Sequence, residues 1–213
     1  MKSPHEDIWG GPMPRTGRRP GPTTIREQIV AAAARCFAAA GYDATSVRHV
    51  AAEAGVDPAL VRRFFGGKDQ LFTQVASALI DPERALAAVT VGPPEAAAER
   101  LLRYFLSLLG DVAQPGPFLG LVRSAVTSEH AAGLLRGFLA ERVLGQIAAT
   151  LRADRPDLRA ALVASQLVGL AVTRYAVRLA PLTAADDGEL AGWVAPVLQY
   201  YLTGAPYRQK EQP

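Results

Sequence analysis

The sequence predicts an all-α protein of about nine helices. Apolar residues recur every three or four positions through most of the chain, as Ile25, Ile29 and Ala33 do near its start, and this is the period of a helix with one buried face. Glycine and proline separate the periodic segments. None of these segments alternates apolar and polar residues in the manner of a strand. The fold is therefore expected to consist of packed helices alone.

Composition indicates an ordinary globular chain. Its 213 residues are 49% hydrophobic, which is enough for a buried core. A single cysteine, Cys36, excludes a disulfide framework and favours a reducing, cytoplasmic setting. Arg174 and Arg178 interrupt the most apolar run, so we expect no membrane span. The net charge of +3 and the isoelectric point of about 9.2 permit a basic surface without identifying a partner.

Both ends of the chain differ from the rest. Residues 1–22 are rich in proline and glycine and lack apolar periodicity, so we expect a disordered arm, with Arg15, Arg18 and Arg19 near its end. Two interpretations of the arm remain open: a solvated linker, or a flexible basic segment that follows phosphates or enters a minor groove. Residues 206–213 are expected to form a disordered tail.

The first two helices have clear boundaries in the sequence. The first is expected to begin at Thr23 or Thr24, either of which can cap it, and to end at Gly41. The second is expected to begin at Thr45 or Ser46, both of which are capping residues.

Two more short helices follow. Gly55 ends the second helix, and Asp57 is expected to cap a third, with Pro58 in its first turn where a missing N–H group has no cost. Two glycines at 66 and 67 end this third helix. A fourth begins near Lys68 and shows an apolar stripe.

The second and third helices have the spacing of a helix-turn-helix. Ala51 is small enough for a close helix crossing, Gly55 allows a left-handed turn, and Val61 can lock the second helix onto the first. Arg62 and Arg63 are then expected to project from the opposite side of the third helix. An arginine pair on a helix is usually a solvated face, but beside this hairpin we favour a surface that fits a major groove and its flanking phosphates.

Three motifs run through the segment IVAAAARCFAAAGYDATSVRHVAAEAGVDPALVRRFFGGKDQLF. A first helix ends in F-x-x-x-G-Y, a run T-S-V-R-x-V-A-x-x-A-G-V follows, and F-F-x-x-K-D-x-L closes the segment. Residues 24–72 thereby resemble the DNA-binding domain of the TetR family of bacterial transcriptional repressors. The resemblance implies a helix-turn-helix DNA-binding domain at 23–72 and a helical ligand-binding and dimerisation domain at 73–205. It also implies a homodimer on double-stranded operator DNA, an unidentified small-molecule effector, no cofactor and no enzymatic activity.

When the family's DNA-binding positions are carried over to this sequence, the resemblance implies that residues of the helix-turn-helix contact DNA. The candidate DNA-binding residues are Thr45, Ser46, Arg48, Pro58, Ala59, Arg62, Arg63, Phe64 and Lys68. Hydroxyl and N–H groups at a helix start bind phosphate, as a lysine there does, so Thr45, Ser46 and Lys68 are assigned to phosphate. Arg62 stands where many members have tyrosine, and Phe64 where many have histidine. Because arginine can reach a guanine edge with two hydrogen bonds, the operator preference is expected to differ from that of tyrosine-bearing relatives.

The rest of the chain predicts five longer helices. They are expected at about 94–109, 118–128, 131–153, 158–179 and 189–202. The last two carry more apolar surface than one core needs, and by analogy with the family we expect them to pair with the same helices of a second chain. The alternative is that they are core helices of a monomer.

An effector cavity is expected among the helices between 94 and 179. The candidate lining residues are Phe105, Leu109, Phe118, Val122, Phe138 and Arg142, with Gln166 or Arg174 as a polar group. A stripe of leucine or phenylalanine at helical spacing is more often core than cavity wall.

Two other functional classes were considered. The three histidines, His5, His49 and His130, are too scattered for a metal triad or a nucleophile–base pair, and GGKD at 66–69 lacks the spacing glycine and the serine or threonine of a phosphate loop. A helical protein–protein adaptor remains the alternative. An adaptor predicts no salt-dependent DNA binding, whereas a regulator predicts it.

Overall fold

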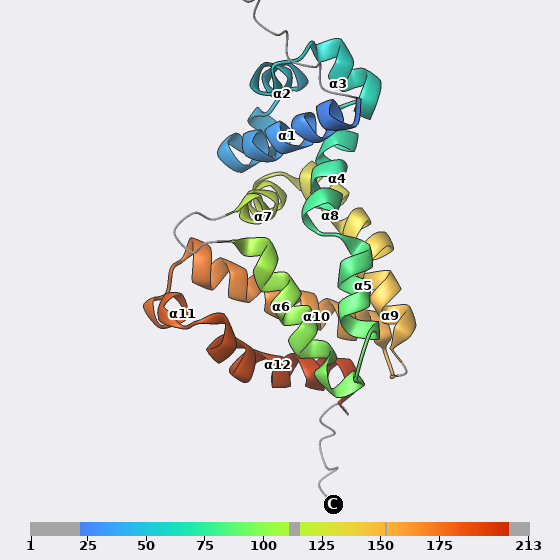
Figure 1. Cartoon of the computed structure of the whole chain (residues 1–213), viewed down its shortest axis with the longest axis vertical. Coiled ribbons are helices and arrows are strands. Elements are labelled where there is room, and N and C mark those ends of the chain that lie inside the picture. The colour runs from blue at the N-terminus through green and yellow to red at the C-terminus, as the bar shows by residue number, and fades with distance from the viewer. Residues whose placement is uncertain (1–21, 111–115, 152, 205–213) are drawn as a thin grey trace, which may run out of the picture.

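The computed structural model describes residues 22–110, 116–151 and 153–204, and this part of the chain is helical without a strand (Figure 1). The expected arm lies outside it apart from Pro22, which begins the first helix, and the expected tail at 206–213 lies outside it entirely. The α-helices are α1 (Pro22–Ala44), α2 (Val47–Ala54), α3 (Pro58–Phe65), α4 (Lys68–Leu79), α5 (Pro82–Thr90), α6 (Ala97–Leu109), α7 (Pro117–Thr127), α8 (Glu129–Phe138), α9 (Gly145–Thr150), α10 (Pro156–Ala171), α11 (Ala180–Ala184) and α12 (Asp187–Thr203).

Three further segments extend these helices. A 3-10 turn, η1 (Pro94–Ala96), leads into α6, and a π-helical segment, η2 (Leu139–Leu144), joins α8 to α9 in one continuous helix. A second π-helical segment, η3 (Val172–Ala176), continues α10. The long helices expected at about 131–153 and 158–179 are therefore each found as one continuous run, at 129–150 and 156–176.

The predicted all-α class is confirmed, and α5 and α11 are additional to the nine expected helices. The sequence did not separate α5 from α4, because apolar positions continue across the junction. Asp81 nevertheless caps α5, its carboxylate accepting the N–H groups of Glu83 (3.0 Å) and Arg84 (3.2 Å), and Pro82 occupies the first turn. The capping residue Asp81 and Pro82 therefore start a new helix, although the apolar period continues across the junction.

The expected helix starts are partly corrected. Since α1 begins at Pro22, neither Thr23 nor Thr24 precedes it. At α2 the cap is Ser46, whose hydroxyl accepts the N–H of His49 at 3.1 Å. Gly41 interrupts the helical backbone of α1 as expected, with φ 78° and ψ 176°.

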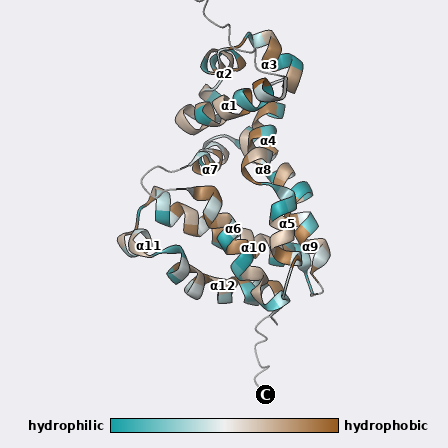
Figure 2. Cartoon of the chain, viewed as in Figure 1, coloured by the Kyte–Doolittle hydropathy of each residue, from teal (hydrophilic) through white to brown (hydrophobic). Residues whose placement is uncertain are grey.

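The helices are arranged along one axis (Figure 1). α1, α2 and α3 gather at one end, α4 leads away from them, and α6, α10 and α12 pack together toward the other end. The domain boundary expected after residue 72 falls inside α4. Hydrophobic and hydrophilic residues alternate around α1 and α3 in the pattern of helices with one buried face (Figure 2).

An aromatic cluster holds the N-terminal helices together. The ring of Phe37 on α1 meets the ring of Phe72 on α4 edge-on at 5.1 Å, and Tyr42 meets Phe72 at 5.2 Å in the same geometry. Ala51 and Val61 are both fully buried, which agrees with the close crossing expected of the helix-turn-helix. α3 itself packs against α2 and α4.

The N-terminal helices are joined to the rest by a close crossing of α1 and α7. A Cβ atom at Gly120 of α7 would lie 2.5 Å from the Cα of Ala38 in α1, so the crossing requires glycine. The guanidinium of Arg123, one turn further along α7, donates a hydrogen bond to the carbonyl of Ala38.

We predict that Gly120→Ala lowers the free energy of unfolding by about 1–3 kcal/mol, because the added methyl group meets backbone atoms that cannot rotate away. Urea unfolding followed by circular dichroism would measure it. The matched control is Gly133→Ala in α8, where a Cβ would meet no atom within 4 Å. The control is expected to be neutral or to stabilise by up to about 1 kcal/mol. Equal effects of the two changes would contradict the close crossing.

In the described residues, no helix combines the length and the apolarity that crossing a membrane requires.

Candidate DNA-binding surface and ligand cavity

The turn between α2 and α3 is set by local backbone chemistry. Gly55 adopts a left-handed conformation (φ 66°, ψ 33°) after α2, and its N–H group bonds back to that helix. Asp57 then caps α3, its carboxylate accepting the N–H of Ala59 at 2.7 Å. The carboxylate is thereby directed at the backbone, which limits its repulsion of a phosphate nearby.

Three exposed arginines extend from this motif. Arg48 lies in the first turn of α2, and Arg62 and Arg63 lie in the last turn of α3. Among the described residues, none of the three side chains forms an ion pair or a hydrogen bond within the chain. Their guanidinium groups therefore retain all five donors for an external acceptor.

Two candidate phosphate residues have other roles in the structure. The expectation for Thr45 is corrected: its side chain is buried, 2% exposed, and its hydroxyl donates to the carbonyl of Gly41 at 2.7 Å. Lys68 is half-buried, donating from Nζ to the carbonyl of Tyr42 at 3.2 Å and lying 4.1 Å from the centre of the Tyr42 ring. Both residues therefore hold α1 against its neighbours.

The remaining helix-turn-helix candidates share one edge of the motif. Ser46 is exposed at the start of α2, and Pro58 and Ala59 form the first turn of α3. Phe64 is half-buried and packs against the core, where its ring centre lies 6.2 Å from that of Phe65. Its main contact within the chain is therefore with the body of the domain.

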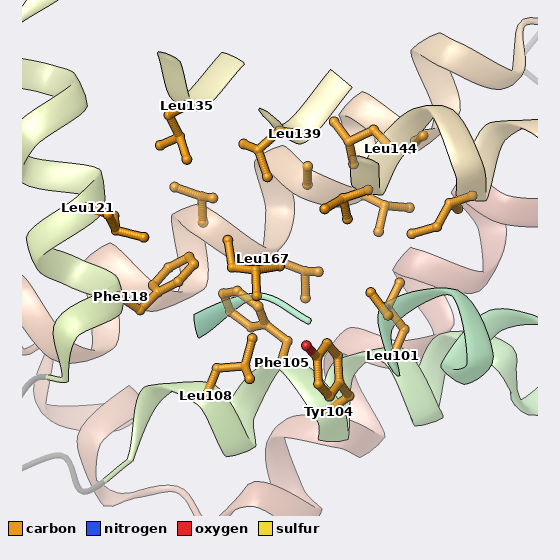
Figure 3. A pocket seen from close by; sticks show the side chains of 18 of the residues that line it. Leu101, Tyr104, Phe105, Leu108, Phe118, Leu121, Leu135, Leu139, Leu144 and Leu167 are labelled. Atoms are coloured by element: carbon orange, nitrogen blue, oxygen red, sulfur yellow. The ribbon is translucent and has the colours of Figure 1, made fainter. Parts of the chain in front are cut away.

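A cavity of about 110 Å³ lies among the helices that follow α4 (Figure 3). Its walls come from the end of α4 and from α5, α6, α7, α8, η2, α9 and α10. The lining residues are Ile80, Ala85, Leu101, Tyr104, Phe105, Leu108, Phe118, Leu121, Val122, Leu135, Leu139, Val143, Leu144, Ile147, Ala160, Val163, Ala164, Leu167 and Val168. Tyr104 is the single polar side chain among them.

The structure places three of the eight predicted lining residues in this wall: Phe105, Phe118 and Val122. Phe105 and Phe118 meet edge-on, with their ring centres 5.2 Å apart. They lie in this wall because the cavity continues the apolar faces of α6 and α7.

The other five predictions are wrong for this cavity. Leu109 and Phe138 are buried in the core outside its wall, and Arg142 and Gln166 are exposed. Arg174 is buried but paired, donating to the carboxylate of Asp187 at 2.8 Å and to the carbonyl of Ala185 at 2.9 Å. A helical period does not distinguish the face toward a cavity from the face toward a neighbouring helix.

Tyr104 connects the cavity to the junction of α4 and α5. Its hydroxyl donates a hydrogen bond to the carbonyl of Asp81 at 3.1 Å, and Ile80, the residue that ends α4, also lines the cavity. Burial raises the pKa of Tyr104 above its usual value, so the phenol is neutral and keeps its proton for this bond. This contact could not be predicted from the sequence, because it joins positions 23 residues apart.

Two family models match the chain over most of its length. Residues 29–75 match the model for bacterial regulatory proteins of the tetR family, and residues 95–202 match the model for the tetracyclin repressor-like C-terminal domain. The chain belongs to the TetR family. It is a DNA-binding transcriptional regulator rather than an enzyme.

Several solved structures have the same fold. A TetR-family regulator from Streptomyces coelicolor A3 is 38% identical, with 87% of this chain and 98% of that chain covered at a TM-score of 0.62. GusR from Salmonella enterica is 20% identical over 86% of this chain and 98% of its own, at a TM-score of 0.59. A transcriptional regulator from Rhodococcus sp. Rha1 is 24% identical, with 83% of this chain and 92% of that chain covered at a TM-score of 0.55. No curated protein matches the sequence.

A polar cluster joins the two halves of this TetR-family chain. The carboxylate of Asp69 on α4 accepts the hydroxyl of Tyr42 on α1, and its second oxygen lies 2.8 Å from Nε2 of His130 on α8. Beside it, the hydroxyl of Ser128, which caps α8, donates to the carboxylate of Asp43 at 3.0 Å. This cluster could not be predicted from the sequence, because its hydrogen bonds join residues 61 and 85 positions apart.

The cluster shifts the titration of two of its members. The hydrogen bond from Tyr42 is the main cause that lowers the pKa of Asp69, and the neighbouring His130 and Lys68 add to it. Burial and the Asp69 carboxylate raise the pKa of Tyr42. The ionised carboxylate and the neutral phenol are therefore the forms that the folded protein favours.

We predict that Asp69→Asn destabilises the protein at pH 7 by no more than about 1 kcal/mol, because the side chain is 43% exposed and partly screened. Since the folded-state pKa is lowered, the stabilisation is present above the unfolded-state pKa. It is lost as the pH falls through the folded-state value, so the variant and the wild type are expected to converge in acid. Urea unfolding at pH 7 and at a series of lower pH values down to about pH 2 measures this.

The control for Asp69 is Glu99→Gln on α6, which removes an exposed carboxylate paired with Arg103 within one helix. Its effect is expected to be a few tenths of a kcal/mol. A gap between Asp69→Asn and the wild type that widens in acid would contradict the assignment.

Proposed function

We propose that the protein is a ligand-responsive repressor that binds a palindromic operator as a homodimer and acts in the cytoplasm. Residues 23–72 would bind DNA, and residues 73–205 would bind the effector and dimerise. The observation that carries the proposal is the set of exposed arginines, Arg48, Arg62 and Arg63, without partners within the described chain. A guanidinium held on a rigid short helix fits both a guanine edge and a phosphate.

We assign the contacts by position on the motif. Arg62 reads a base edge, with Pro58 and Ala59 close to the groove floor, while Arg63 and Arg48 contact bases or the neighbouring phosphates. Ser46 and Lys68 are assigned to phosphate, Lys68 through donors that remain beside its bond to Tyr42. Phe64 supports the position of α3 from its half-buried site. Thr45 is not assigned to DNA, because its hydroxyl is buried.

We predict that Arg62→Ala relaxes sequence preference at one position in each half-site and weakens operator binding by about 1–3 kcal/mol. Selection of bound duplexes from a random DNA pool, followed by titration of the selected sequence at two salt concentrations, measures both. Arg103→Ala on α6 is the matched control, because this exposed arginine is paired with Glu99 far from α3. The control is expected to select the wild-type motif with the wild-type affinity.

A selected motif that is not palindromic, or one that Arg62→Ala leaves unchanged, would reject this assignment. If no motif is enriched at all, the helical adaptor becomes the better description of the chain.

Dimerisation is proposed through α10 and α12, the helices expected from the sequence to pair between chains. On α12 the exposed fractions are 78% for Trp193, 41% for Val197 and 50% for Tyr200, and on α10 Leu158 is 41% exposed. Exposed apolar side chains grouped on neighbouring helices are typical of an interface. A two-fold dimer would read two half-sites roughly 34–36 Å apart.

We predict that Trp193→Glu shifts the protein from dimer to monomer at micromolar concentration, because a charge would be buried without a partner in the contact. Sedimentation equilibrium measures it. Val91→Glu is the control: Val91 is 66% exposed and follows α5, outside both helices. A dimer that survives Trp193→Glu as it survives the control would place the interface elsewhere.

The response to ligand is proposed as a population shift through α4. The cavity contacts α4 at Ile80 and reaches Asp81 through the Tyr104 hydroxyl, so an occupant that moves either residue favours a different angle of α4. The two recognition helices of the dimer would then no longer match the distance between the operator half-sites. A ligand that binds tightly and leaves operator affinity unchanged would reject this mechanism.

A further inference from the structure

We infer that the effector is a compact, uncharged molecule built around a single aromatic ring with little or no polar substitution. This inference rests on the proposed ligand response and specifies the chemistry of its site. It follows from the residues that line the cavity and from the contacts that the arginines of this part of the fold already make.

The wall offers almost nothing to a polar ligand. Eighteen of the nineteen lining residues are aliphatic, alanine or phenylalanine. The exception, Tyr104, already donates its one hydroxyl proton to Asp81. A carboxylate or ammonium group placed there would lose its water shell without gaining a counter-ion, and an uncompensated buried ion costs several kcal/mol.

Four arginines of this part of the fold already have contacts within the chain. Arg84 is exposed, and its guanidinium carbon lies 5.3 Å from the centre of the Tyr104 ring. Arg100 donates to the carbonyls of Ala88 (3.0 Å) and Pro93 (2.9 Å). Arg159 donates to the carboxylate of Asp154 at 2.5 Å, where the pKa of Asp154 is lowered chiefly by this hydrogen bond. Arg174 is held by Asp187, as described above. Turning Arg100, Arg159 or Arg174 toward the cavity would break these hydrogen bonds.

The size and shape of the cavity favour a ring. Its volume of about 110 Å³ is of the same order as apolar cavities of roughly 150 Å³ that stay dry and bind benzene. Phe105 and Phe118 stand at right angles in the wall (Figure 3), so a ring beside them can stack on one and meet the edge of the other.

Part of the cavity wall comes from η2, where the backbone is π-helical instead of α-helical. Leu139, Val143 and Leu144 line it from the π-helical segment η2, and such segments are frequent at functional sites. A Cβ at Gly145, directly after them, would lie 2.5 Å from the carbonyl of Ala140, so glycine is required for this backbone. An ordinary α-helix here would place these three side chains differently.

Three probes of nearly equal size test the inference: toluene, benzoate and benzylammonium. Toluene at ten times its Kd is expected to raise the Tm of the full-length protein by about 3–6 °C, and the two ions at the same concentration by less than about 1 °C. Calorimetric titration gives the Kd values directly. Binding of benzoate or benzylammonium as tight as that of toluene overturns the inference.

A filled cavity provides the matched variant. Ala164→Leu on α10 adds three carbons at the wall and is expected to weaken toluene binding at least tenfold, whereas Ala149→Leu at an exposed position of α9 leaves it unchanged. Toluene binding that Ala164→Leu does not alter would place the probe outside this cavity and overturn the assignment. If Ala164→Leu does not fold, the contrast between toluene and its two ions in the wild type still decides.

Operator binding, measured in the same samples, separates the two proposals. If no probe binds while the operator is bound with sequence preference, the inferred ligand class is wrong and the DNA-binding regulator stands. If toluene binds in the cavity and operator affinity does not change, the cavity chemistry is right and the ligand response is wrong.

Discussion

The crossing of α1 and α7 at Ala38 and Gly120 determines how the two halves of the chain are placed. Two helices can approach this closely only where a side chain is missing, and Gly120 supplies the gap. The polar contacts of Asp69 with Tyr42 and His130 lie beside this crossing and fix the rotation of α4 relative to α8. Packing sets the distance between the helices, and directional hydrogen bonds set their angle.

This arrangement gives the recognition helix a defined relation to the cavity. α3 packs against α2 and α4, with Val61 and Phe72 among the buried side chains, and Ile80, which caps the end of α4, lies in the cavity wall. A change in the wall therefore reaches α3 through one rigid helix. Asp69 holds the polar cluster near the start of α4, so the helix is restrained at one end by side-chain hydrogen bonds and at the other by apolar packing and the Tyr104 bond.

The helix-turn-helix could be predicted from the sequence because its determinants are local. Gly55, Asp57 and Pro58 act within a few residues, through backbone conformation and capping, and the structure has them where the sequence placed them. The cavity could be predicted only in part. Whether Phe105 or Leu109 faces the void depends on how α6 is rotated against distant helices, and the period of one helix carries no information on that.

Charge placement shows the same difference between local and long-range determinants, and it bears on function. Arg174 and Arg62 look alike in the sequence, as cations within apolar helices. In the fold Arg174 is buried and paired with Asp187, whereas Arg62 is exposed without an intramolecular partner among the described residues. A buried guanidinium needs a partner within the chain, since its desolvation is costly, whereas an exposed one is solvated and is free to exchange water for phosphate or a base. The paired arginine therefore contributes to the stability of the fold, whereas the exposed one keeps its donors for an external acceptor.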